Sequence, residues 1–144
     1  MRPRHATKAD LPDVEALLHS CSLPTDGIRE KAVQFLVSRD KAGLLGCVGI
    51  QECNGKVALL QGLAVTERAR RAGLATLMVS ALVADLRMRG IESLVVSTNS
   101  AVGYFSRLGF TPVDRTKVLP ELLASQEVSN RITTRSMAFM TVEL

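Results

Sequence analysis

The sequence has few aromatic residues and no tryptophan. Its 144 residues include one Tyr and four Phe. Proteins that bind single-stranded nucleic acid stack bases on several exposed aromatic rings. The net charge of +4 is also small for a nucleic-acid binder. We therefore expect no nucleic-acid partner, and nucleic-acid binding stays a minor alternative that rests on a local cluster of arginines.

Long apolar runs are missing as well. No stretch reaches the roughly 18 apolar residues of a transmembrane helix. The start of the chain, MRPRHATKAD, contains charges with no apolar segment after them, unlike a secretory signal peptide. We expect no membrane association and a cytoplasmic location.

Metal-ligating residues are scarce. The chain has three Cys and two His, with no CxxC pair and no His spacing typical of a metal site. An odd number of cysteines in a chain without an export signal is typical of free thiols in a reducing compartment. We expect no metal.

The pattern of apolar residues predicts a single α/β domain over residues 1–144, because no linker or repeat divides the chain. Helices are predicted at 10–21, 28–34, 74–88 and 101–108, and a turn or helix at 120–126. Strands are predicted at 1–6, 35–39, 44–53, 57–65, 93–97, 110–114 and 137–142. One parallel strand–helix–strand crossover within an otherwise antiparallel order predicts a mixed sheet with helices on both faces.

The most informative segment joins the strand at 57–65 to the longest helix. It reads Arg70-Arg71-Ala72-Gly73-Leu74-Ala75-Thr76. The unpaired N–H groups and positive dipole at a helix start attract anions, and small residues let a ligand approach the backbone. Arg68, Arg70 and Arg71 add positive charge. The segment predicts an anion site, and an exposed basic turn is the alternative.

Two motifs resemble the GNAT acetyltransferases. Residues 70–75 match that family's phosphate-binding signature, [Q/R]-x-x-G-x-[G/A]. The segment from Asn99 to Phe110, ending in Leu-Gly-Phe, resembles the family's helix after the fifth strand. Together the motifs cover residues 57–115, and the order of elements fits the whole chain. The resemblance implies a GNAT-like mixed, mainly antiparallel, splayed α/β sheet.

The resemblance also implies acetyl-CoA as co-substrate and a set of binding residues. The backbone of Leu63, Ala64 and Val65 would pair with the pantetheine arm, and the Leu63 N–H would polarise the acetyl carbonyl. Arg70 and the N–H groups from Arg71 to Thr76 would hold the pyrophosphate. Asn99 and Phe105 would flank the pantetheine and the thioester.

The sequence departs from the family pattern at the acid and at the base. The usual acid is a Tyr four residues before the Gly of Leu-Gly-Phe, and here that position is Phe105. The adjacent Tyr104 is a candidate substitute, although its side chain would point about 100° away on a helix. A leaving thiol with a pKa near ~8.5 needs little protonation. Gln61 lies where many relatives have a Glu, which leaves three candidate bases that are also compatible with plain surface charges: Asp26, Glu52 and Glu67.

Within the family, the sequence is similar to arsenic-resistance-type and short amino-acid N-acetyltransferases. The matching pieces are residues 23–27, Phe105, 110–115 and 119–120. This resemblance implies a small amine or amino-acid-like acceptor, with Asp26 in its binding loop and Arg115 paired with its carboxylate or, alternatively, in a surface salt bridge. A protein acceptor and a homodimer stay open. The missing Tyr and Glu favour one further alternative, a non-catalytic module that binds CoA.

Overall fold

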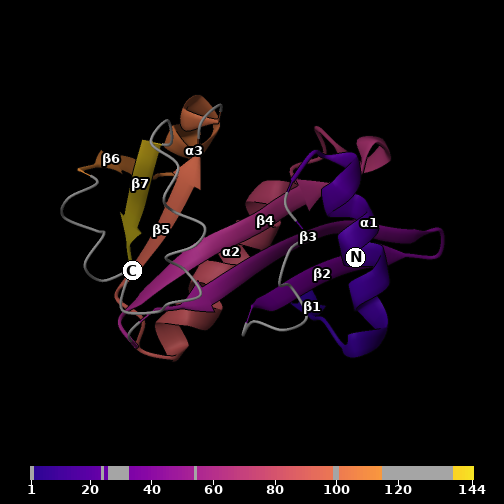
Figure 1. Cartoon of the computed structure of the whole chain (residues 1–144), viewed down its shortest axis with the longest axis horizontal. Helices are drawn as coiled ribbons and strands as arrows, with labels where there is room; N and C mark the ends of the chain where they lie inside the picture. The colour runs from indigo at the N-terminus through magenta and orange to yellow at the C-terminus, as the bar shows by residue number, and fades with distance from the viewer. Residues whose placement is uncertain (1, 24, 26–32, 54, 99–100, 115–137) are drawn as a thin grey trace. The chain divides into compact units, whose positions relative to one another are not determined.

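The computed structural model describes residues 2–23, 25, 33–53, 55–98, 101–114 and 138–144 (Figure 1). Three α-helices occur in this part of the chain: α1 (Leu11–Ser20), α2 (Leu74–Met88) and α3 (Val102–Arg107). Two short 3-10 helices are η1 (Lys8–Asp10) and η2 (Glu67–Ala69). The strands are β1 (Arg4–His5), β2 (Gln34–Asp40), β3 (Gly43–Glu52), β4 (Val57–Val65), β5 (Ser93–Thr98), β6 (Thr111–Val113) and β7 (Ala138–Glu143).

The strands form one mixed sheet in the order β1-β2-β3-β4-β5-β7-β6. β4 and β5 run parallel, with Val57 opposite Ser93 and Leu60 opposite Val96. The pairs β1–β2, β2–β3, β5–β7 and β6–β7 are antiparallel. The prediction of a mixed, mainly antiparallel α/β sheet is confirmed.

Most predicted boundaries lie within two residues of the observed ones, and β4 has the predicted bounds. Gln34 differs, because it begins β2, opposite Ile50 of β3, instead of ending a helix. Pairing to a long neighbouring strand decides its conformation, which local apolar spacing could not reveal. The rest of that predicted helix, at 28–32, and the turn or helix at 120–126 lie outside the described residues.

The chain divides into two compact units, which we describe separately. The first contains residues 1–50 and 61–85, and the second contains 51–60 and 86–144. In the first unit, the apolar stripe of α1 packs on β2 and β3. Its buried cluster comprises Val14, Leu17, Leu18, Phe35, Val37, Leu44, Cys47 and Ala64.

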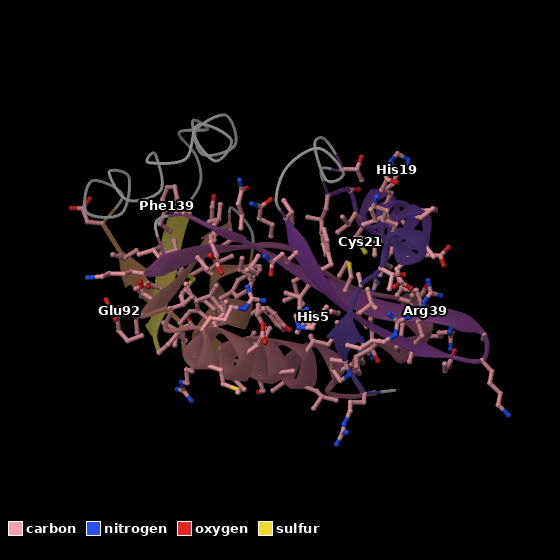
Figure 2. All side chains as sticks on the ribbon, turned by 90° about the horizontal axis from the view of Figure 1, so that it is seen from below. His5, His19, Cys21, Arg39, Glu92 and Phe139 are labelled. Atoms are coloured by element: carbon pink, nitrogen blue, oxygen red, sulfur yellow. The ribbon has the colours of Figure 1, made fainter. Side chains whose placement is uncertain are left out.

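Helices cover both faces of the strands in the first unit, with α1 and α2 on opposite sides (Figure 2). Two glycines of β3 leave room for close neighbours, one on α2 and one on β2. A Cβ on Gly46 would come within 3.0 Å of the Met78 sulfur in α2, and one on Gly49 would come within 2.8 Å of the Phe35 ring. A side chain at either position would have to displace a neighbour, so the close approach of α2 at Gly46 and of the Phe35 ring of β2 at Gly49 depends on glycine.

The second unit has its own core. A buried cluster on β4, β5 and β7, with Cys53 just after the end of β3, comprises Cys53, Val57, Leu59, Val95 and Phe139. None of the described helices is long and apolar enough to cross a membrane.

A buried carboxylate ties the ends of three elements of the first unit together. Asp10 is 3% exposed and accepts hydrogen bonds from Arg4 Nη1 and Nη2 at 2.9 and 3.1 Å and from Arg39 Nε at 2.9 Å. The N–H of Thr7, the N-cap residue of η1, also donates to it, at 2.8 Å. Asp10 thereby links β1, the start of α1 and the end of β2, and Figure 2 shows Arg39 beside α1.

The Asp10→Asn variant should destabilise the protein by about 3 kcal/mol at pH 7, because it leaves two guanidinium groups without their shared counter-charge. Hydrogen bonds from Arg4, Thr7 and Arg39 hold the pKa of the Asp10 carboxyl well below its ordinary value of 3.8. The unfolded chain therefore takes up this proton first as the pH falls. The stabilisation is complete above about pH 5 and is lost as the pH falls through the native pKa.

Urea unfolding of both proteins at pH 7 and pH 3 measures this difference. The gap between wild type and variant should shrink at pH 3. Asp13→Asn is the matched control, because Asp13 binds only Arg39 Nη2 in this network and its side chain is 55% exposed. Its effect should stay below about 1 kcal/mol. Equal effects of the two substitutions would contradict the proposed role of Asp10.

Candidate functional site

The predicted anion site is a turn in the first unit, between the end of β4 and the start of α2. β4 ends at Val65, the short helix η2 follows, and Arg70 is extended, with φ −69° and ψ 152°. Arg71 and Gly73 then adopt left-handed backbone conformations, with φ +67° and +77°. A left-handed conformation is strained for arginine, and such strain is concentrated at functional sites.

Arg70 fastens this turn to its surroundings. Its Nε donates to the Val65 carbonyl at 3.1 Å, and its Nη2 lies 3.7 Å from Cys21 Sγ at the end of α1. Figure 2 shows Cys21 at this end of α1. These two contacts hold the turn in place and leave less of the hydrogen-bonding capacity of Arg70 for a ligand.

Arg68 has a different role from the one that the charge pattern suggested. Its guanidinium forms a two-pronged ion pair with Asp40 at the end of β2, at 2.7 and 2.8 Å. This pairing also holds the pKa of the Asp40 carboxyl below its ordinary value. The positive charge of Arg68 is thus balanced locally, a contact that the sequence could not reveal because the two residues are 28 positions apart.

Arg71 is the third arginine of the cluster. It is exposed, and within the described residues it has no hydrogen bond or ion pair. Within the described residues, only Arg68 of the three is paired with a carboxylate, and Arg70 binds neutral groups. Arg71 is therefore the cationic side chain of the turn that is left with neither a counter-charge nor a hydrogen bond in the described part of the protein.

The start of α2 fits an anion. The Leu77 N–H donates to the Gly73 carbonyl at 3.0 Å, so the N–H groups before Leu77 in the first turn have no carbonyl four residues earlier in the helix. The first turn contains no acidic residue. A Cβ added to Gly73 would meet no atom within 4 Å, so the backbone here is open to an approaching group. Ala72 is exposed, Leu74 is buried, and Ala75 and Thr76 follow in the helix.

The predicted pantetheine-binding residues lie in the last part of β4. Ala64 is 5% exposed, and Leu63 and Val65 are half-buried. The residue before them, Gly62, has a φ of +62° in the middle of a strand, which is the geometry of a β-bulge. Its carbonyl accepts a hydrogen bond from the Cys47 thiol of β3 at 3.3 Å. The sequence interpretation missed both features, although a glycine inside an apolar strand is a signal for a bulge.

The aromatic candidates lie on α3, in the second unit. Phe105 is 6% exposed and makes edge-to-face contacts with Tyr104 and Phe110, each with ring centroids 5.4 Å apart. The Tyr104 oxygen is buried and has no hydrogen-bond partner in the part of the chain that the structure describes. Burial raises the pKa of Tyr104, so the hydroxyl keeps its proton at neutral pH.

Of the remaining candidates, two lie in the described part of the chain. Glu52 forms an ion pair with Arg89 at 3.1 Å in the second unit, and Glu67 is exposed in η2. Asp26, Asn99 and Arg115 lie outside the described residues.

Comparison with known proteins identifies the family of the chain. A family model described as an acetyltransferase (GNAT) domain matches residues 31–112. The chain is 25% identical over 126 residues to the uncharacterized protein YwlB of Bacillus subtilis, covering 86% of this chain and 84% of YwlB. It is 30% identical over 90 residues to the uncharacterized N-acetyltransferase CT2212 of Chlorobaculum tepidum, covering 62% of this chain and 57% of that protein.

The fold is also similar to that of the N-acetylglutamate synthase from Neisseria gonorrhoeae, solved with coenzyme A and N-acetyl-glutamate. The TM-score is 0.79 at 21% identity, over 99% of this chain and 34% of the synthase chain. This chain therefore spans about a third of the synthase. The family match covers more than half of the sequence, including the bulged strand and the turn before α2. The chain belongs to the GNAT family of N-acetyltransferases.

Proposed function

We propose that the protein transfers an acetyl group from acetyl-CoA to the amino group of a small amine or amino-acid-like molecule, and that residues 1–144 act as one acetyltransferase domain. The observation that supports this most strongly is the turn at 70–76. It matches the family's phosphate-binding signature, and its backbone is left-handed at Arg71 and Gly73.

The turn would hold the pyrophosphate of the co-substrate mainly through backbone N–H groups. Left-handed residues turn successive N–H groups toward one side, and the start of α2 adds its unpaired donors and dipole. Arg71, exposed beside them, would add a mobile positive charge. Arg70 would act indirectly, by holding the turn against Val65.

The end of β4 would position the reacting group. Acetyl-CoA supplies an acetyl group activated as a thioester. The backbone of Leu63, Ala64 and Val65 would align the pantetheine arm as an additional strand, and the Leu63 N–H would stabilise negative charge on the acetyl oxygen. Correct placement supplies much of the rate enhancement in such a transfer, because the attacking amine needs only proximity and loss of a proton.

Proton transfer in this reaction involves an acid and a base. Phe105 packs in the core beside Phe110 and has no proton to give. The Tyr104 hydroxyl is protonated and buried, so it stays a candidate acid despite its position one residue away from the family's usual tyrosine. The resemblance to the family implies that Asn99 and Phe105 would flank the pantetheine arm. Asp26 and Glu67 remain candidate bases, whereas Glu52 is held by Arg89.

The acceptor class rests on resemblance. The Neisseria synthase was solved with N-acetyl-glutamate, and this supports an amino-acid-like acceptor for a chain of similar fold. The segments similar to arsenic-resistance-type and short amino-acid N-acetyltransferases support the same class. Arg115 would then pair with the carboxylate of the acceptor, and Asp26 would lie in the acceptor loop.

A second candidate is a module that binds CoA without catalysis. The phenylalanine at position 105 favours it, because the usual acid is missing there. Turnover measurements separate the two functions.

The Arg71→Gln variant should raise the Kd for CoA by about threefold to tenfold at low salt, because it removes one exposed charge from a phosphate site. The loss should shrink as salt is added, since mobile ions screen exposed charges. Isothermal titration calorimetry at two salt concentrations measures both effects.

The matched control is the double variant Asp40→Asn with Arg68→Gln, which removes a neighbouring but balanced ion pair and leaves the net charge unchanged. Its Kd for CoA should stay within about twofold of the wild type. A double variant that weakens binding more than Arg71→Gln would place the phosphate contact elsewhere.

Release of the CoA thiol from acetyl-CoA should accelerate with α-amino acids or their phosphinic and arsinic analogues, and less with polyamines, aminoglycosides or a lysine peptide. The reason is the carboxylate-binding role proposed for Arg115. Thiol release with each acceptor, followed by mass spectrometry of the product, measures this preference. Saturable CoA binding with no acceleration by any amine would support the non-catalytic module.

A further inference from the structure

Strand β4 contains an extra residue relative to its neighbour β3. The Cys53 N–H donates to the Val57 carbonyl at 2.9 Å, and the Thr66 N–H donates to the Leu45 carbonyl at 2.8 Å. Between these two bonds there are eight residue steps on the β3 side, from 45 to 53, and nine on the β4 side, from 57 to 66. Within β4 only Gly62 has a positive φ, +62°. The extra residue of β4 is therefore accommodated in a bulge at Gly62.

The bulge fixes the direction of one peptide group. The Gly62 carbonyl and the Leu63 N–H belong to the same peptide, which is planar, and the described chain contains no cis peptide bond. In a planar trans peptide the C=O and the N–H point in opposite directions. Whatever holds the Gly62 oxygen therefore also aims the Leu63 N–H.

The Cys47 thiol holds that oxygen. Cys47 is fully buried, and its Sγ donates to the Gly62 carbonyl at 3.3 Å. The Ala64 N–H forms a hydrogen bond to the same sulfur. The sulfur thus contacts the backbone on both sides of Leu63. Burial raises the pKa of the Cys47 thiol to about 12, so the thiol keeps the proton that it donates.

Two apolar side chains pack against the bulge. A Cβ added to Gly62 would lie 3.1 Å from Leu18 Cδ2 and 3.2 Å from Phe35 Cε1. Leu18 is 1% exposed and Phe35 is 5% exposed, so neither can easily move aside. We define Cys47, Leu18 and Phe35 as the bulge clamp.

We infer that Cys47 is a positioning residue for acetyl transfer: through the Gly62 carbonyl, its thiol orients the Leu63 N–H that acts on the acetyl oxygen. This inference rests on the proposed function, in which Leu63 is the donor. Cys47 acts through the backbone and does not touch the substrate. A stabilising donor must be aimed at the oxygen that becomes negative, so a small rotation of the peptide lowers the rate more than it lowers binding.

The Cys47→Ala variant removes the donor and leaves the chain one atom smaller. It should lower kcat by about tenfold and change the KM for acetyl-CoA by less than about twofold. Cys47→Ser keeps a hydroxyl donor at the same position and should restore part of the lost kcat. If the thiol had only a structural role, Cys47→Ser would not restore kcat, and Cys47→Ala would not lower kcat without a matching change in KM.

The matched control is Cys53→Ala. Cys53 is also buried, and its Sγ donates to the Gln51 carbonyl at 3.6 Å, but it lies in the second unit. Both alanine variants should lower Tm by a few degrees, whereas only Cys47→Ala should lower kcat. Equal kcat for Cys47→Ala and the wild type, or an equal loss in both variants, would overturn the inference.

A second measurement does not depend on turnover. The Leu63 amide resonance of the ¹⁵N-labelled protein should shift in Cys47→Ala and return toward its original position in Cys47→Ser. An unchanged Leu63 resonance in Cys47→Ala would overturn the clamp even if the proposed function held. If the wild type does not turn over acetyl-CoA but Cys47→Ala still shifts the Leu63 resonance, only the proposed function is contradicted. If Cys47→Ala does not fold, Phe35→Leu should show the same Leu63 shift and the same loss of kcat.

Discussion

The orientation of a single peptide group, Gly62–Leu63, is the constraint on which the proposed site depends. β4 pairs with β5 from Val57 to Leu60 and then continues to Val65. Its first part is thus paired within the sheet, and its last part would bind the pantetheine arm. The bulge at Gly62 lies between these two parts. It is held by a thiol on its carbonyl and by two buried side chains over the glycine, all from the first unit. The core of that unit therefore acts on function through the backbone, without placing a polar side chain at the reacting atoms.

In the turn after β4, the backbone also contributes more to the proposed site than the charged side chains do. Three arginines occur within four positions, yet each has a different environment. Arg68 is paired with Asp40, Arg70 is hydrogen-bonded to the Val65 carbonyl, and Arg71 is exposed in a left-handed conformation. The local surplus of positive charge is thus smaller than the sequence suggests. Most of the attraction for a phosphate would come from the backbone N–H groups at the start of α2, which substitution of a single arginine does not remove.

The sequence predicted the elements whose pattern is local. The bounds of β4 and the end of α2 at Met88 follow from apolar runs bounded by Gly55 and Gly90, and the phosphate-binding signature lies where it was expected. The features that depend on distant partners could not be predicted. The Arg68–Asp40 pair, the Asp10 network and the Cys47 contact with Gly62 each join residues that are far apart or on different strands. Gln34 illustrates the same limit, because its partner in β3 decides its conformation.

Amide hydrogen exchange in the presence and absence of CoA tests the central claim most directly, namely that the turn before α2 binds the pyrophosphate through its backbone. Saturating CoA should slow exchange of the amides from Arg71 to Thr76, while the amides of β1, the edge strand of the first unit, should exchange at unchanged rates. Saturable CoA binding that leaves the amides of Arg71 to Thr76 unprotected would contradict the account.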